Sequence, residues 1–297
     1  MTTVGWICNL DADLELADPD GFAPSARLRQ QVDAMAERLL ATARAACPRV
    51  QHVRIDDGGA PTVCQAWCAT PRARAQATRH GVALPAAPAL AVLQRVNHRS
   101  FAAGFGLGLP HAAFVTSLPQ LEAMLTASHP ARVWLCKRPF GFSGRGHKRV
   151  GGVLAGGDRR WAEASMTAYG RGLMVEPLVA VEAEFALHAW LDADGTCLTG
   201  RPTTLVTDER GAWLRSEAAT DLVEQERQQL DAAHALAAAE LSAAGYFGPF
   251  SIDAFRYRDE RGELRFHALS ELNARYSMGF FVGLAERLEE WLLRVRR

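Results

Sequence analysis

The stretch SELNARYSMGFF, residues 270–281, constrains the fold more than any other part of the chain. In it Glu271, Asn273 and Arg275 alternate with apolar residues. Residues two apart in an extended strand point to the same side. The pattern therefore predicts a strand with a carboxylate, an amide and a guanidinium in a row on one face. Such a row suits a divalent metal that carries a phosphate, a set of surface ion pairs, or no ligand at all.

The composition is that of a globular protein, since 48% of the 297 residues are hydrophobic and 22% are charged. This length favours about two domains. Lys+Arg and Asp+Glu are both 33, so no overall basic field would gather nucleic acid or bind a membrane surface. We find no apolar run of membrane-spanning length and no signal peptide at the start, and we expect a cytoplasmic protein. The six cysteines lack the paired spacing of a zinc site and are interpreted as reduced thiols.

The order of predicted elements indicates two parts. Residues 3–10 and 50–56 are apolar strand candidates on either side of a helical pattern at 24–46, which predicts an α/β domain with parallel strands over 1–92. The remainder, 93–297, alternates helices with successive antiparallel strands and a long helix near 224–246, which predicts a mixed α+β region. A further helix is expected at 71–81, where Arg72, Arg74 and Arg79 form a solvated face or meet a substrate carboxylate.

A glycine-rich loop follows a predicted strand in the segment KRPFGFSGRGH. Lys137 ends the strand, and Gly141, Ser143, Gly144 and Gly146 follow it. Glycine lets backbone N–H groups approach an anion closely, and a lysine adds a point charge for phosphate. Because the lysine precedes the glycines and no helix clearly follows, the segment is neither a P-loop nor a dinucleotide fingerprint. The alternative is a flexible hairpin with surface cations.

Carboxylates also mark two later strands. Glu176 ends a strand before Pro177, and Glu184 enters the next one; a turn with solvated carboxylates is the alternative. Asp253 lies in a strand that precedes residues 270–281, and a symmetric four-residue turn between the two strands is expected to place it on the face of Glu271. Two carboxylates and the amide oxygen nearby suit Mg²⁺, although ion pairs at a sheet edge are the alternative.

Taken in order, these elements resemble the ATP-grasp superfamily of carboxylate–amine or carboxylate–thiol ligases over about residues 90–297, and most specifically in the ELNAR segment. The resemblance implies an ATP-grasp fold with a preceding α/β domain at 1–92. It also implies an ATP-grasp domain at 93–297, divided into a lid at about 110–175 and a C-terminal subdomain with the metal site at 176–297.

The resemblance implies a role for each matching residue. The ATP phosphates would be held by Lys137, by the glycine-rich loop with Gly141, Ser143, Gly144 and Gly146, and by Arg99, which stands where many members carry lysine. The adenine would be recognised by the backbone of a hinge made of Glu176, Pro177, Leu178 and Val179. The ribose hydroxyls would be bound by Glu184. One or two Mg²⁺ ions, with Mn²⁺ as an option, would be held by Asp253, Glu271 and Asn273. Arg275 and Lys137 would act in catalysis by neutralising charge on the transferred phosphoryl group.

The implied reaction is activation of a substrate carboxylate as an acyl phosphate, followed by attack of an amine, with ADP and phosphate released. The implied partners are small molecules, with no nucleic acid or membrane and a possible homodimer. Two alternatives stay open: a small-molecule kinase, and a catalytically idle ATP-binding or scaffold module. His188 and His267 are interpreted as packed or solvated strand histidines, and Trp134, Trp190 and Trp213 as core residues.

Overall fold

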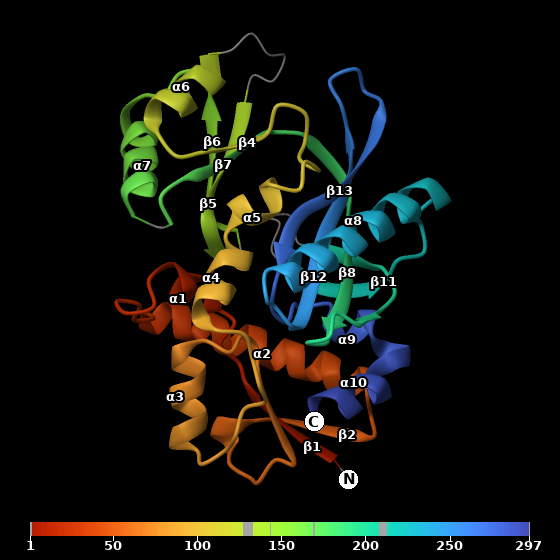
Figure 1. Ribbon diagram of the computed structural model, residues 1–297. Coiled ribbons are helices and arrows are strands. Elements are labelled where there is room, and N and C mark those ends of the chain that lie inside the picture. The colour runs from red at the N-terminus through yellow and green to blue at the C-terminus, as the bar shows by residue number, and fades with distance from the viewer. Residues whose placement is uncertain (1, 127–132, 143, 169, 208–212, 297) are drawn as a thin grey trace.

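The computed structural model describes residues 2–126, 133–142, 144–168, 170–207 and 213–296 (Figure 1). The N-terminal part is a parallel sheet of order β2-β1-β3 flanked by helices. Its elements are β1 (Thr2–Ile7), α1 (Ala12–Ala17), α2 (Ala26–Ala46), β2 (Val50–Arg54), the 3-10 turn η1 (Ile55–Asp57), β3 (Val63–Ala66) and α3 (Pro71–Arg79). The two expected strands and the helix between them are present, and the short helix α1 was not expected.

Helix α2 forms where the sequence supplies both a cap and an apolar stripe. The hydroxyl of Ser25 accepts a hydrogen bond from the backbone N–H of Leu28 at 3.2 Å, which satisfies one of the unpaired donors of the first turn. Leu28, Val32, Ala36 and Leu39 are buried at helical spacing and pack into the main core.

A second sheet, of order β4-β7-β5-β6, forms the lid-like part at the upper left of Figure 1. It follows α4 (Leu90–Asn97) and α5 (Arg99–Ala103), and its elements are β4 (Ala113–Val115), α6 (Leu118–Thr126), β5 (Val133–Phe142), β6 (Arg145–Gly151), α7 (Gly156–Thr167) and β7 (Leu173–Pro177). This part packs around a hydrophobic cluster of its own that includes Leu121, Trp134 and Val175. The glycine-rich segment is the hairpin between β5 and β6.

The third part is an antiparallel sheet of order β11-β10-β8-β12-β13 covered on one side by a long helix. Its elements are β8 (Ala180–Leu191), β9 (Cys197–Thr199), β10 (Thr203–Thr207), β11 (Trp213–Ala218), α8 (Glu224–Ala243), β12 (Gly248–Arg258) and β13 (Leu264–Asn273). Leu230 and Leu241 of α8 are buried in one cluster with Phe185 and Ile252 of the sheet. Alternate side chains of these strands therefore face away from α8, toward the rest of the molecule.

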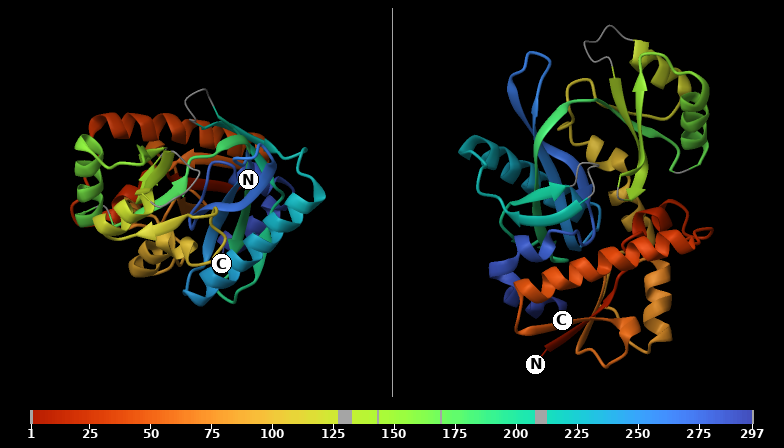
Figure 2. Two further views of the ribbon diagram at one scale, coloured as in Figure 1. Left: turned by 90° about the horizontal axis from the view of Figure 1, so that it is seen from above. Right: turned by 180° about the vertical axis from the view of Figure 1, so that it is seen from behind.

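The chain returns to its N-terminal domain at the end. After β13 come α9 (Phe280–Gly283), η2 (Ala285–Arg287) and α10 (Leu288–Val295), and both termini lie beside the parallel sheet (Figure 2). The ring of Trp291 stacks on that of Trp6 with centroids 6.2 Å apart, and the indole N–H of Trp291 donates to the hydroxyl of Tyr276 at 3.1 Å. The C-terminal helices thus complete the core of the first domain.

The register of β12 and β13 differs from the expected one. Arg258 pairs with Leu264 across a five-residue connection, whereas the four-residue turn would have paired Arg258 with Glu263 and set Asp253 opposite Ala268. Farther along there is a bulge: one residue lies between Asp253 and Phe255 in β12, but three lie between His267 and Glu271 in β13. The extra residue in the turn and the two extra residues in the bulge of β13 together place Asp253 directly opposite Glu271.

Candidate active site

A cavity of about 260 Å³ lies between the N-terminal domain, the β5–β6 hairpin and the face of the large sheet that points away from α8. Eight of the residues predicted from sequence line it: Arg99, Gly141, Gly144, Glu184, Asp253, Glu271, Asn273 and Arg275. Six predicted residues lie outside its lining, namely Lys137, Gly146, Glu176, Pro177, Leu178 and Val179. Ser143 falls outside the described residues.

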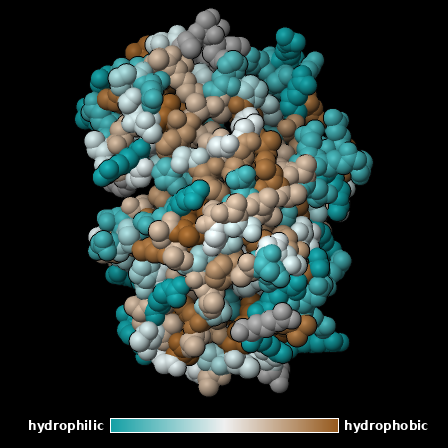
Figure 3. Space-filling view, in the orientation of Figure 1, coloured by the Kyte–Doolittle hydropathy of each residue, from teal (hydrophilic) through white to brown (hydrophobic). Residues whose placement is uncertain are grey.

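A larger hollow of about 800 Å³ lies elsewhere, lined by residues of α1, α4, α5 and α8. Figure 3 shows hydrophobic residues gathered along the middle of the face that carries these last three helices. None of the predicted site residues lines it. We place the candidate site in the smaller cavity because the charged groups converge there.

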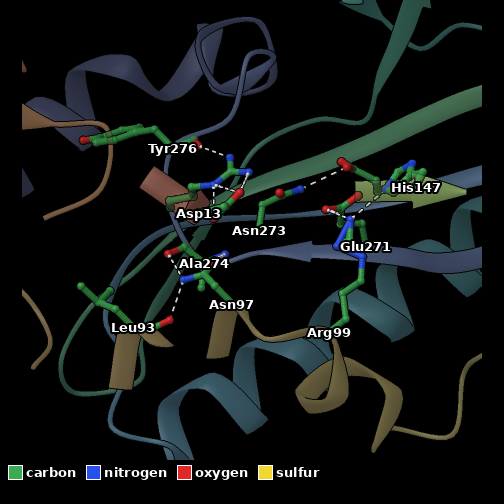
Figure 4. Close-up of polar contacts among 11 residues, drawn as sticks. Asp13, Leu93, Asn97, Arg99, His147, Glu271, Asn273, Ala274 and Tyr276 are labelled. Atoms are coloured by element: carbon green, nitrogen blue, oxygen red, sulfur yellow. Dashed lines mark hydrogen bonds and ion pairs between the residues drawn. The ribbon is translucent and has the colours of Figure 1, made fainter. Parts of the chain in front are cut away.

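The two carboxylates of the site face each other across paired strands. Asp253 is opposite Glu271, and the side-chain amide of Asn273 donates to Oδ2 of Asp253 at 3.0 Å (Figure 4). Burial, followed by the nearby charge of Glu271, raises the pKa of Asp253 to about 7. Burial also acts to raise the pKa of Glu271, but Arg99 and the other nearby cations hold it below its ordinary value. Nearby cations therefore favour the ionised form of Glu271, whereas burial and Glu271 disfavour the ionised form of Asp253.

Arg99 lies against this pair. It is the first residue of α5, and its Nη2 is 2.8 Å from Oε1 of Glu271 and 3.4 Å from Nε2 of His147 on β6 (Figure 4). Burial and the charge of Arg99 lower the pKa of His147 to about 4, so this imidazole is neutral at neutral pH. Arg99 thus joins the helix before the lid to both the lid hairpin and β13.

Arg275 is held by a carboxylate that the sequence analysis did not single out. Its Nη2 lies 2.6 Å from Oδ2 of Asp13 on α1, and its Nε lies 3.1 Å from both carboxylate oxygens. The guanidinium also lies over the ring of Trp67, 5.8 Å from the centroid. Both charged side chains are buried, with 13% and 8% of their surfaces exposed for Arg275 and Asp13. The arginine of the ELNAR segment therefore ties the large sheet to the N-terminal domain.

Lys137 forms the second buried ion pair near the site. Its Nζ lies 2.6 Å from Oε2 of Glu176, across the pairing of β5 with β7. Burial raises the pKa of Glu184, and the charge of Lys137 opposes that rise, so the lysine lies near both carboxylates. Val179 packs nearby with Phe255 and Tyr257 in a small hydrophobic cluster.

No protein-family model matches the sequence, and no curated protein matches it. Solved structures do match, and three represent them. D-alanine–D-alanine ligase from Bacillus anthracis matches with a TM-score of 0.54 and 11% identity, over 100% of this chain and 99% of that one. Pyruvate carboxylase from Rhizobium etli matches with a TM-score of 0.57 and 14% identity, over 96% of this chain but only 27% of that one. Biotin carboxylase from Campylobacter jejuni, in a complex with a βγ-ATP ligand, matches with a TM-score of 0.56 and 12% identity, over 88% and 68% of the two chains.

The chain has the ATP-grasp fold. The glycine-rich hairpin and the paired carboxylates line one cavity. The α/β class predicted from sequence is confirmed.

The site of this ATP-grasp fold suits a hard divalent cation. Among the described residues no group of three or more His, Cys, Asp or Glu side chains is arranged to hold a metal. Mg²⁺, however, is usually held by one or two carboxylates plus substrate phosphates. Asp253 and Glu271 supply two carboxylates directly opposite each other on β12 and β13, which fits that ligand set.

Sequence reasoning missed the acidic residues that follow β1. Arg72 lies against carboxylate oxygens of both Asp11 and Glu15, and Thr70 donates to Glu15 at 2.7 Å. The signal was present as NLDADLEL, in which acidic residues come directly after a buried strand. Arg72 is thus ion-paired and does not line the cavity, while Arg74 and Arg79 are exposed.

Two residues assigned to packing alone also line the cavity. His188 is buried in β8 as expected, but Trp213, interpreted as core, is half-buried and forms part of the cavity wall. No helix in the described part of the chain is long and apolar enough to cross a membrane.

Proposed function

We propose that the protein is an ATP-dependent ligase that activates a substrate carboxylate as an acyl phosphate for attack by an amine. One observation carries this proposal: in an ATP-grasp fold, a single cavity gathers paired carboxylates, two arginines and the glycines of a lid hairpin. Its reactants are small molecules. No nucleic acid or membrane takes part in the proposed reaction, and the homodimer stays a prediction.

In this proposal the nucleotide lies between the lid and the large sheet. Lys137 and the hairpin glycines contact its phosphates, and the backbone of 176–179 reads the adenine. The side chain of Glu184 accepts hydrogen bonds from the ribose. The small apolar cluster that contains Val179, Phe255 and Tyr257 supports the placement of the base, because an aromatic ring system needs an apolar contact surface. The division of the chain at 1–92, 93–297 and about 110–175 belongs to the same proposal.

Asp253, Glu271 and Asn273 are the residues that would hold Mg²⁺ or Mn²⁺. A bound divalent cation supplies positive charge that stabilises the transferred phosphoryl group. The two carboxylates and the amide oxygen are hard ligands on one face of β12 and β13, which supports this assignment. Arg99 would balance the charge of Glu271 beside them.

The chemistry has two balanced steps. An oxygen of the substrate carboxylate attacks the γ-phosphorus of ATP, the bond to the β-γ bridging oxygen breaks, and ADP leaves. The nitrogen of the amine then attacks the acyl carbon, phosphate leaves with the bonding electrons, and the amine loses a proton. The residues Arg99, Lys137 and Arg275 supply charge and orientation rather than covalent bonds, as is usual for phosphoryl transfer.

One observation favours a different outcome. Arg99 and Arg275 are both ion-paired with carboxylates, Glu271 and Asp13. A module that binds ATP without turnover could keep these pairs permanently, whereas a ligase must offer at least one guanidinium to phosphate. The small-molecule kinase remains the other candidate, because it uses the same first step with a hydroxyl or a carboxylate as the final acceptor.

Phosphate release and product mass distinguish these functions. The protein is incubated with Mg²⁺, ATP and a matrix of carboxylic acids and amines, and free phosphate and ADP are measured. A ligase releases phosphate only when both an acid and an amine are present, and it forms their amide. A kinase forms ADP and a phosphorylated substrate without any amine. Nucleotide binding without ADP formation under every condition would support the idle module.

A further inference from the structure

The cavity of the candidate site has two chemically different halves. Along β12 and β13 it is lined by Asp253, Glu271 and Asn273, with Arg99 and Arg275 beside them. We call the opposite side, toward β10 and β11, the neutral half. Its wall contains Leu205, Trp213, Ser216, Ser277, Met278 and Met35.

The polar groups of the neutral half are already paired with one another. The indole N–H of Trp213 donates to the hydroxyl of Ser216 at 3.0 Å. His188 lies between two hydroxyls, with its Nδ1 2.8 Å from Ser277 and its Nε2 3.1 Å from Thr203. These side chains form a wall without a formal charge when His188 is neutral.

The hydrogen bonds set the state of His188. Thr203 donates its hydroxyl proton to the carbonyl of Ala186 at 3.3 Å, so it accepts from Nε2–H of His188. Nδ1 then accepts the proton of Ser277. Burial lowers the pKa of His188 to about 3, which makes the imidazole neutral and too weakly basic to activate Ser277 as a nucleophile. His188 and Ser277 therefore contribute to the wall of the cavity as a neutral hydrogen-bonded pair.

The contact surface of the neutral half is aromatic and sulfur-rich. Trp213, Met35 and Met278 are each half-buried at the cavity. Thioether side chains adapt to irregular apolar shapes, and indole rings offer flat apolar surface. Glu184, which pairs with Leu205 across β8 and β10, also lines the cavity beside this wall. A second carboxylate placed here would lose its hydration next to that carboxylate, whereas an apolar group would gain by leaving water.

Building on the proposed function, we propose that the activated carboxylate belongs to an acid whose remaining body is uncharged and hydrophobic. The carboxylate lies at the charged half, near Arg275, and an aryl or branched alkyl group occupies the neutral half between Trp213, Met35 and Met278. Dicarboxylic acids are disfavoured, because their second carboxylate would leave water beside Glu184.

Calorimetric titration tests this substrate class. The probes are 3-phenylpropionate and succinate, each titrated into the whole protein with and without Mg²⁺ and a non-hydrolysable ATP analogue. We expect 3-phenylpropionate to bind at least tenfold more tightly than succinate. Equal binding of the two, or tighter binding of succinate, overturns the inference. Titration of the analogue itself tests the proposed function separately, and the nucleotide-free titrations test the pocket even if the analogue does not bind.

Three variants distinguish a loss of substrate recognition in the neutral half from a general loss of folding. Trp213→Ala should weaken 3-phenylpropionate binding at least tenfold, whereas Leu214→Ala, the neighbouring and 43% exposed residue outside the cavity lining, should leave it unchanged. Met35→Lys places a cation in the neutral half on helix α2, which tolerates lysine. It should improve succinate binding relative to 3-phenylpropionate. Unchanged preferences in both Trp213→Ala and Met35→Lys would overturn the inference.

Discussion

At the scale of single residues, the site is dominated by carboxylates whose charges are incompletely balanced. Arg99 compensates Glu271 at 2.8 Å, but the carboxylate of Asp253 has only the amide of Asn273 as a hydrogen-bond donor among the described contacts. The pKa of Asp253 rises to about 7 as a result of burial and of Glu271. Ionised Asp253 therefore destabilises the folded protein.

The Asp253→Asn variant should be more stable than the wild type at pH 8 without divalent cations. An unfolded aspartate has a pKa of about 3.9, so the folded state holds an extra proton between about pH 4 and 7 and loses stability as pH rises through this window. Removing the charge should raise the free energy of unfolding by roughly 1–2 kcal/mol at pH 8 and change it little at pH 4.

Urea unfolding at both pH values measures this difference. Asp231→Asn, on the exposed face of α8, serves as the control and should shift stability little at either pH. A variant at Asp253 that is destabilised at pH 8 in the absence of Mg²⁺ would contradict the charge imbalance described for the site.

The sequence predicted single residues better than it predicted their partners. Alternation in the ELNAR segment was enough to place Glu271 and Asn273 on one face, because the period of a strand is fixed. Asp13 could not be found in this way, since its partner Arg275 lies 262 positions later and meets it only in the folded chain. Trp213 was misjudged because hydrophobicity does not distinguish a core side chain from a cavity wall.

At the scale of elements, two connections determine the geometry of the site. The ion pair of Asp13 with Arg275 joins α1 to the end of β13, and the β5–β6 hairpin covers the cavity from the lid. The longer helices, such as α2 and α8, follow from periodicity, whereas the short helix α1 does not. The register of β12 and β13 does not, because it depends on a five-residue turn and a bulge that no period encodes.

The Asp13–Arg275 pair should show strong coupling. Asp13→Leu leaves a buried guanidinium without its carboxylate and should cost about 3–5 kcal/mol of unfolding free energy. Adding Arg275→Met should recover a large part of this loss, because the unpaired charge is removed. A double-mutant cycle by urea unfolding measures the coupling.

The exposed pair of Arg215 with Glu217 provides the matched control for that cycle. Its side chains are 60% and 53% exposed, so its coupling should stay below about 1 kcal/mol. Equal coupling energies for the two pairs would show that the Asp13–Arg275 contact does not link the domains as described.

The lid hairpin contains a glycine, Gly146, whose backbone conformation and surroundings both disfavour a side chain. Gly146 has a φ of +85°, and a Cβ there would lie 3.3 Å from the Cβ of Arg138. Gly146→Ala should therefore destabilise the protein by roughly 1–2 kcal/mol. Gly151→Ala, in the same strand but in open space, should change stability by less than about 0.5 kcal/mol. Thermal unfolding of both variants compares them, and similar losses would argue against a backbone constraint at Gly146.

At the scale of the whole molecule, the N-terminal domain and the large sheet share one core that α10 completes. The lid has a further hydrophobic cluster of its own, and it also joins the shared core through Phe140 and Phe142 at the end of β5. Figure 2 shows the lid and the large sheet as separate layers above the parallel sheet. The order of elements allowed this architecture to be predicted. The docking of α10 onto β1 and β2 was not predicted, because an amphipathic helix does not reveal its partner surface.

The most direct test of the central claim is thermal unfolding with Mg²⁺ and a non-hydrolysable ATP analogue, on wild type and on Glu271→Ala. A ligand at 100 times its dissociation constant stabilises the folded state by about 2.7 kcal/mol. We expect a clear rise in the wild-type melting temperature that requires nucleotide and Mg²⁺ together, and loss of the metal-dependent part in the variant. Equal melting temperatures with and without both ligands in the wild type would contradict a Mg–ATP site at Asp253 and Glu271.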